Sequence, residues 1–372
     1  MDLPLWAWPW FGLARQLIGE NHQTRNERRG DGLARGAGDG AGRRLGEGPH
    51  LERLLTPIEE PIFLCTGPGV ESRFLTESIS TLLMASIVTL NVTAASAGLS
   101  RLLQAPSWEG RVAAVFHTSI LCVGPQERLL HLHGGPRLVS PFSLRIEGTL
   151  TGAIQASRPV VGMPLRKTGL GLEIPGCIRC WLGEVAYYHS PRCFAGEVDP
   201  HTLRMAEQIL WCTGRSGGFI AIPGNQAVAT TIRGALAQRR PDQMLAVARR
   251  IIGLGPGLTP SGDDFLVGCL RGLWLIAPGQ TWEYELLRHL RTALLPSLDD
   301  HTTHVGAEFI RSALNGAFAE VLDQAAMALV SSVHTQTALS AIGHLLAQGE
   351  TSGTDTTHGL LTCLDALLAA HH

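Results

Sequence analysis

One segment of the sequence combines alternating glycines with adjacent acidic residues. It runs from Gly253 to Gly268 and reads GLGPGLTPSGDDFLVG. Glycines such as Gly255 and Gly257 allow backbone angles that other residues avoid, so successive N–H groups can converge on an anion. The carboxylates of Asp263 and Asp264 add acceptors for an amide or ligands for a cation. The segment therefore predicts a site that binds and positions a small ligand.

The same loop opens a helix that we expect to be buried. Ser261 and Asp264 have the spacing of a capping box, and the residues that follow are apolar on nearly every face. The positive end of the helix then lies at the loop, where it stabilises a carboxylate or phosphate. Asp263 and Asp264 project about 100° apart, so when one caps, the other faces a ligand amide or a cation. The simpler interpretation, which stays open, is that Ser261 and Asp264 only cap a core helix and the glycines only form a tight turn.

Part of the sequence pattern of this loop recurs near the C-terminus. The pattern Ser-Gly-x-Asp-x-x-x-Gly occurs over residues 261–268 and again over 352–359, the second time followed by the apolar run Leu360–Leu368. One interpretation is that two helix N-termini meet around one ligand, and the other is chance or a shared way of capping helices. A ligand a few bonds long can join the two loops only if they lie within about 10 Å of each other.

Neither loop matches a familiar nucleotide or nucleophile motif. No Gly-Lys-Ser/Thr closes the first loop, and the preceding segment Met244–Ile252 is helical in pattern rather than extended. Ser261 lacks the Gly-x-Ser-x-Gly elbow of hydrolases. We therefore expect the loops to bind and position a substrate.

Two further polar clusters raise the question of a metal site. His301, His304 and Glu308 share a face at the start of a predicted helix, where Thr302 or Thr303 is a suitable cap. Their spacing matches no standard zinc signature, so a solvated or substrate-facing helix start is favoured. A pair of thiols three residues apart resembles a zinc knuckle only loosely, because the spacings to the next candidate ligands are irregular. The zinc candidates are Cys177, Cys180, His189 and Cys193, and the candidates to neutralise an anionic substrate are Arg145, Arg179, Arg215 and Arg233.

The composition of the 372 residues excludes several classes of protein. Hydrophobic residues make up 45% and charged residues 17%, as in a compact enzyme-like protein, and a net charge of −2 offers no basic field for nucleic acid. Eight scattered cysteines fit a reducing cytoplasm. Met1–Gly19 lacks the features of a signal peptide, and Ser78–Ser100 carries too many Ser, Thr and Asn residues to span a membrane. We therefore expect a cytoplasmic protein that binds neither nucleic acid nor membrane.

The pattern along the chain predicts an α+β fold, with an N-terminal β-rich domain followed by a mostly α-helical C-terminal domain. Residues 1–60 read as a disordered Gly/Arg-rich leader, residues 61–197 as the β-rich domain, and residues 198–372 as the helical domain that carries the acidic loop. Asp199 is expected to cap the first helix of that domain. Strands are predicted at Val112–Phe116, Ser119–Val123, Leu129–Leu132, Phe142–Ile146 and Gly169–Ile174, and helices at 227–239, 242–252, 263–276, 282–294, 303–332, 335–348 and 358–370.

The acidic-loop sequence resembles the hallmark of a prokaryotic family that includes the AllH subunit of oxamate carbamoyltransferase. The resemblance spans roughly residues 84–370 and takes in Thr302, Thr303 and the segment Gly349–Asp355. It implies a cytoplasmic protein of purine and allantoin breakdown that works with FdrA-like and AllG-like subunits to exchange a carbamoyl group between oxalurate and phosphate. The chain departs from the pattern at His304-Val305-Gly306, where a serine is expected soon after the threonine pair.

The leading hypothesis is therefore a subunit of an oxamate carbamoyltransferase-like complex. Oxamate joins a carboxylate to an amide, and carbamoyl phosphate joins an amide to a phosphate, so N–H donors beside carboxylate acceptors suit both. No cofactor and no metal are expected. The alternatives are a non-catalytic assembly or ligand-sensing subunit, and a metal-dependent amidohydrolase that uses Asp263, Asp264 and His304. The predicted catalytic residues are Asp263 and Asp264, and the predicted substrate-binding residues are Gly255, Gly257, Thr259, Ser261, Gly262, Thr302, Thr303, Ser352, Gly353 and Asp355.

Overall fold

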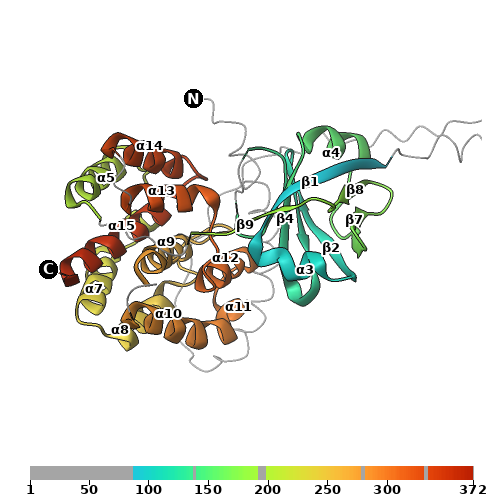
Figure 1. Ribbon diagram of the computed structural model, residues 1–372. Coiled ribbons are helices and arrows are strands. Elements are labelled where there is room, and N and C mark those ends of the chain that lie inside the picture. The colour runs from blue at the N-terminus through green and yellow to red at the C-terminus, as the bar shows by residue number, and fades with distance from the viewer. Residues whose placement is uncertain (1–86, 137–139, 192–197, 278–280, 331–333, 372) are drawn as a thin grey trace, which may run out of the picture. The chain divides into compact units, whose positions relative to one another are not determined.

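The computed structural model of the chain describes residues 87–136, 140–191, 198–277, 281–330 and 334–371 (Figure 1). The predicted leader, residues 1–60, and the first part of the predicted β-rich domain lie outside these residues, as does Cys193. In the described part, strands occupy the chain from Val88 to Tyr188 and the longer helices follow from Pro200 onward. The predicted α+β order, with strands first and helices afterwards, is confirmed.

The described strands form one sheet that closes on itself. Eight strands follow each other in the order β5-β4-β3-β2-β6-β7-β8-β1, and a further pairing of β1 with β5 joins the two ends into a barrel. The ninth strand, β9, runs parallel to the last residues of β1. The strands are β1 (Val88–Ser96), β2 (Ser107–Val115), β3 (Ser119–Val123), β4 (Leu129–His133), β5 (Ser143–Ile146), β6 (Pro164–Thr168), β7 (Gly171–Ile174), β8 (Ile178–Trp181) and β9 (Ala186–Tyr188).

Two neighbouring strands of this barrel are covered on both faces. Every residue of β3 and of β4 is buried, whereas β2 and β6 alternate between buried or half-buried and exposed residues over part of their length. Because successive side chains of a strand point to opposite faces, full burial requires a cover on the outer face as well as a packed interior. The apolar core of the barrel includes Leu258 and Val305 from the helical part of the chain, and Phe142 meets Phe309 edge to face with ring centroids 5.0 Å apart.

The helical part begins where the sequence predicts it to begin. The side chain of Asp199 accepts hydrogen bonds from the backbone N–H groups of His201 (3.1 Å) and Thr202 (3.0 Å), so it caps α5 as expected. Within the described residues, no helix combines the length and the apolar character needed to cross a membrane. The helices are α3 (Ser100–Gln104), α4 (Thr151–Ser157), α5 (Pro200–Thr213), α6 (Gly218–Ala221), α7 (Asn225–Ala237), α8 (Pro241–Ile251), α9 (Ser261–Ile276), α10 (Thr281–Leu294), α11 (Leu298–His301), α12 (His304–Leu314), α13 (Glu320–Val330), α14 (Thr335–Leu346) and α15 (Ser352–His371).

One predicted helix is two helices in the structure. The pattern over 303–332 predicts a continuous helix, but α12 ends at Leu314 and α13 begins at Glu320. Gly316 adopts φ +75°, and the N–H of Ala317 donates to the carbonyl of Ser312 (2.9 Å). A glycine in the left-handed conformation with such a bond ends a helix. The break is not visible in the hydrophobic periodicity, because the residues on both sides of it are apolar.

The helices α9 and α15, which carry the two Ser-Gly-x-Asp patterns, pack closely against each other. A Cβ atom on Gly268 would overlap the carbonyl oxygen of Thr356, and one on Gly359 would overlap the carbonyl oxygen of Phe265, both far inside the 3.0 Å that real Cβ atoms respect. Gly268 and Gly359 occupy equivalent places in the two patterns, and so do Phe265 and Thr356. The two helices therefore make the same contact twice: the last glycine of each pattern lies against the backbone of the fifth residue of the other pattern.

The equivalence extends to the helix before each loop. A Cβ atom on Gly262 would overlap the carbonyl oxygen of Ile251 at the end of α8, and one on Gly353 would overlap that of Leu345 near the end of α14. Each pattern thus marks a helix-loop-helix unit in which the second glycine lets the two helices approach. The repeated sequence pattern therefore corresponds to a repeated packing unit, formed once by α8 and α9 and once by α14 and α15.

We predict that Gly268→Ala destabilises the protein by about 3 kcal/mol or more, because the added methyl group meets backbone atoms that cannot move aside. Gly343→Ala is the matched control, since Gly343 lies on an exposed face of α14 with nothing near its Cβ position. This control should stabilise the protein by up to about 1 kcal/mol through helix propensity. Urea unfolding measures both changes, and equal tolerance of the two substitutions would contradict the close crossing.

Candidate functional site

The two acidic loops meet in the structure. The hydroxyl of Thr259 in the first loop lies 3.1 Å from the hydroxyl of Ser352 at the second, and the Ser352 hydroxyl also donates to the carboxylate of Asp264. The loops are thus far closer than the distance a small ligand can bridge. The predicted meeting of two helix N-termini is confirmed as geometry.

The serines and aspartates of the two patterns interact crosswise. Ser352 of α15 bonds to Asp264 of α9, and the hydroxyl of Ser261 of α9 faces Asp355 of α15, where it favours the charged form. The predicted capping box between Ser261 and Asp264 is wrong, because Pro260 is the N-cap and no side chain caps α9. Ser261 is already the first helical residue, so its hydroxyl points toward the other repeat instead of back along its own backbone.

Asp263 ties the first loop to the start of α12. Its carboxylate accepts hydrogen bonds from the N–H of Gly253 (2.7 Å) and from the hydroxyl of Thr302. A side chain at Gly306 would overlap the same carboxylate, so the glycine in His304-Val305-Gly306 makes room for Asp263. The two aspartates therefore have separate tasks, as their different directions on the helix predict.

Thr303 joins the same corner from the other side. It is the N-cap of α12, as predicted, and its hydroxyl accepts a hydrogen bond from the N–H of Gly306 (2.9 Å). The same hydroxyl donates to the carbonyl of Leu258 in the first loop. Thr302 and Thr303 thus both hydrogen-bond to the first acidic loop.

A third loop, which the sequence reasoning missed, packs onto the second pattern. It runs over residues 214–218, from the end of α5 to the first residue of α6. The N–H of Arg215 donates to the hydroxyl of Thr354 (3.0 Å), and the N–H of Phe219 donates to Asp355 (2.7 Å). A Cβ atom on Gly218 would lie 2.5 Å from the Asp355 carboxylate. The Gly-Arg-Ser-Gly-Gly sequence of this loop was the available signal.

The exposed rim of the first loop carries N–H groups that the fold does not use. Gly255 and Gly257 have φ +108° and +103°, and neither N–H donates to another described residue. At the start of α9, the N–H of Gly262 donates to the carbonyl of Leu254, and that of Asp263 donates to the carbonyl of Pro260. The rim therefore offers donors for an anion in addition to those that the helix dipole favours at the start of α9.

Three carboxylates of the two patterns are buried together. Asp263, Asp264 and Asp355 are 1%, 6% and 0% exposed. Burial raises the pKa of Asp263 to about 6, against the opposing bonds from Thr302 and Gly253, and burial likewise raises the pKa of Asp355 to about 6. The pKa of Asp264 is raised well above its usual value, first by burial and further by the charges of Asp355 and Asp263. Burial therefore favours the protonated form of each carboxyl in the cluster.

The predicted histidine cluster is not brought together. His301 is exposed, and His304 Nε2 lies 2.5 Å from the carbonyl oxygen of Glu127 on the barrel. The fully buried Glu308 is paired with Arg128 (2.8 Å) and Arg311 (2.7 Å). These contacts use the side chains that the metal interpretation requires.

The thiols do not form a zinc site either, as far as the described residues extend. The Cys177 thiol donates to the carbonyl of Ser157 (3.3 Å), and Cys180 is buried in β8. In that part of the chain, no group of three or more His, Cys, Asp or Glu side chains has metal-binding geometry.

The arginines predicted to meet an anionic substrate lie in different settings. Arg179 pairs with Glu173 (3.0 Å) and Arg233 with Asp365 (2.8 Å), both at the surface. Arg215 belongs to the third loop beside the second pattern. Arg145 lies on the barrel, where it donates to the carbonyl of Pro136 (2.8 Å).

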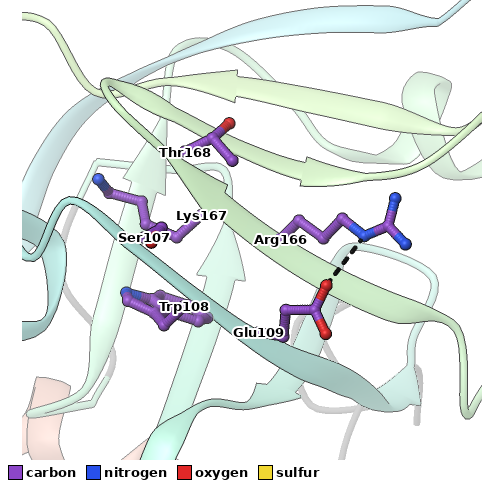
Figure 2. A pocket seen from close by; sticks show the side chains of 6 residues that line it. All are labelled: Ser107, Trp108, Glu109, Arg166, Lys167 and Thr168. Carbon is purple, nitrogen blue, oxygen red and sulfur yellow. Dashed lines mark ion pairs between the residues drawn. The ribbon is translucent and has the colours of Figure 1, made fainter.

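A pocket on the barrel lies apart from the predicted site residues (Figure 2). It is lined by residues 107–109 of β2 and 166–168 of β6, and Figure 2 shows the ion pair between two of these residues, Arg166 and Glu109 (3.3 Å). The Lys167 ammonium donates to the carbonyls of Ala105 (3.0 Å) and Gly169, so this cation is engaged by the backbone. We assign no function to this pocket.

We predict that Asp263→Asn removes a pH-dependent loss of stability. Asp263 has a pKa of about 6 in the folded protein and of about 3.9 when unfolded. Ionisation therefore destabilises the folded state as the pH rises from about 4 through 6. Asparagine does not ionise, so the unfolding free energy of the variant relative to the parent should rise by on the order of 3 kcal/mol between about pH 4 and pH 8.

Urea unfolding at the two pH values measures this difference. Asp300→Asn is the control, because Asp300 is exposed and its substitution should give the same difference at both. Parallel pH curves for the parent and Asp263→Asn would contradict the buried, proton-binding carboxylate.

Comparison with known proteins adds one finding to this geometry. No solved structure matches the chain. The family model described as oxamate carbamoyltransferase subunit AllH matches residues 251–364. The matched segment begins at the last residue of α8 and includes both acidic loops and the α9–α15 crossing. Over these residues the chain is similar to the AllH family, and the match supports an AllH-like assignment.

Proposed function

We propose that this chain is a subunit of an oxamate carbamoyltransferase-like complex and that its paired loops bind a small anionic amide. The observation that carries the proposal is that the family match covers both loops, which the structure joins through Thr259, Ser352 and Asp264. The reaction we propose is exchange of a carbamoyl group between oxalurate and phosphate in allantoin breakdown. FdrA-like and AllG-like subunits are the proposed partners, and the cytoplasm the proposed compartment.

The chemistry of the paired loops suits such a ligand. The unused N–H groups of Gly255 and Gly257 offer donors to a carboxylate or phosphate, and Arg215 of the third loop offers a positive charge. The buried carboxylates of Asp263 and Asp264 offer acceptors to an amide N–H. Burial favours the protonated form of Asp264; a protonated carboxyl donates to a carbonyl oxygen, while an ionised neighbour accepts from the amide nitrogen.

The separation of the N–H donors of the rim from the carboxyl groups of the aspartates limits the repulsion between the site and an anionic ligand. Three ionised aspartates would repel an anion, but the burial that raises the pKa of Asp263, Asp264 and Asp355 opposes their ionisation. The anionic end of the ligand then faces the glycine rim, and the amide end faces the acids. Such fixed dipoles stabilise charge that develops during transfer without rearranging.

A second candidate function is a non-catalytic assembly or ligand-sensing subunit. The observation that favours it is the burial of the same carboxylates, which are at most 6% exposed and already accept hydrogen bonds from Gly253 and Ser352. In this case the aspartates only hold the three loops together, and the chemistry belongs to a partner subunit.

We predict that Asp264→Asn lowers phosphate-dependent oxalurate cleavage by the reconstituted complex by about 100-fold or more, the loss typical of a group that acts on developing charge. The assay reconstitutes the chain with its FdrA-like and AllG-like partners. Asp300→Asn is the control, since Asp300 is exposed and makes no hydrogen bond or ion pair with either loop among the described residues, and it should leave the rate unchanged.

Assembly of each variant with its partners is checked by size-exclusion chromatography before the rates are compared. An Asp264→Asn complex that assembles and cleaves oxalurate at the parent rate would reject the catalytic role and leave the assembly function. Absence of cleavage by the parent complex would reject the proposed reaction itself.

A further inference from the structure

A row of polar side chains crosses three neighbouring strands of the barrel. Ser119 of β3 lies directly opposite His133 of β4, and His133 lies beside Arg145 of β5. Residues in register on adjacent strands point to the same face of the sheet, so the hydroxyl, the imidazole and the guanidinium project together. The row belongs to neither acidic loop.

Two members of this row are buried with unused hydrogen-bonding atoms. Ser119 is 3% and His133 is 4% exposed, and neither Ser119 Oγ nor His133 Nε2 has a hydrogen-bond partner among the described residues. Each such buried atom lowers the stability of the protein as long as it stays unpaired. Because two such atoms lie side by side on adjacent strands, a polar ligand that pairs with them gains more binding free energy than it would at the surface.

The neighbours of His133 fix which of its nitrogens carries the proton. Nδ1 lies 3.1 Å from the carbonyl oxygen of Gly134, which can only accept, so Nδ1 holds the hydrogen and Nε2 is left with a lone pair. Burial lowers the pKa of His133, the Gly134 carbonyl opposes this, and the Arg145 charge lowers it further. The other titratable neighbour is His131 on the same strand, with ring centroids 5.4 Å apart. The ring is therefore neutral near pH 7, with Nε2 as an acceptor.

Arg145 supplies the positive charge of the row. Its guanidinium donates to the carbonyl of Pro136 (2.8 Å) and weakly to the hydroxyl of Thr93 (3.3 Å), and both partners are uncharged. No carboxylate pairs with Arg145 among the described residues, in contrast to Arg179 and Arg233. The side chain is half-buried and reaches the surface, which gives an ion a way of approach.

We infer that Ser119, His133 and Arg145 form a binding site for an oxyanion that carries one acidic hydrogen, of which hydrogenphosphate is the simplest. Its P–OH group donates to His133 Nε2, and its other oxygens accept from the Ser119 hydroxyl and the Arg145 guanidinium. Sulfate has the same shape and charge but no hydrogen to donate, so it binds well only when His133 takes up a proton.

Calorimetric titration of the whole chain with inorganic phosphate and with sulfate tests this site. At about pH 8, phosphate should bind at least about tenfold more tightly than sulfate, because sulfate leaves one buried acceptor unpaired. The affinity for sulfate should increase as the pH falls. Equal affinity for the two ions at about pH 8, or no phosphate binding, would overturn the assignment.

Substitutions separate this site from the acidic loops. Arg145→Gln and Ser119→Ala should each weaken phosphate binding by about tenfold. Ser119→Ala should also raise the melting temperature without phosphate, since it removes an unpaired buried hydroxyl; the gain shows that the variant folds. Arg166→Gln on β6 is the arginine control, and it should leave phosphate binding unchanged. Binding lost in Asp264→Asn but kept in Arg145→Gln would overturn the site.

Discussion

The close crossing of α9 and α15 is the contact on which the site depends. At Gly268 and Gly359 each helix lies against the backbone of the other, and only a residue without a side chain permits this distance. The crossing brings the starts of both helices together, so that Ser352 reaches Asp264 and Ser261 faces Asp355. Without it, the two patterns would be two separate helix starts, each too small to hold a ligand.

The buried aspartates explain why three loops and the start of α12 converge on one place. A carboxylate removed from water is costly unless it is protonated or hydrogen-bonded. Asp263 receives bonds from Gly253 and Thr302, and Asp355 receives one from Phe219. Each bond fixes a different loop against the α9–α15 pair. Ionisation of these buried aspartates lowers the stability of the folded protein at high pH, and the same aspartates orient the glycine rim. The stability of the site therefore depends on its state of protonation.

Much of this arrangement follows from local patterns, and the remainder depends on contacts distant in sequence. Asp199 and Thr303 cap helices as predicted, and the strand Ser119–Val123 has its predicted bounds, because capping and alternation are decided by neighbouring residues. The meeting of the loops was predictable only from their shared spacing. The capping role of Ser261 was mispredicted because its real neighbour, Asp355, is remote in sequence. The loop 214–218 was missed for the same reason, since its glycines gain meaning only beside Asp355.

The central claim is that the two loops act as one unit, and a double-mutant cycle between Ser352→Ala and Asp264→Asn tests it most directly. Unfolding free energies of the parent, the two single variants and the double variant give the coupling between the loops. The account predicts a coupling of about 1–2 kcal/mol, whereas Ser352→Ala combined with the exposed Asp300→Asn should be additive within about 0.5 kcal/mol. Additive effects of Ser352→Ala and Asp264→Asn would show that the loops are independent and would contradict a shared site.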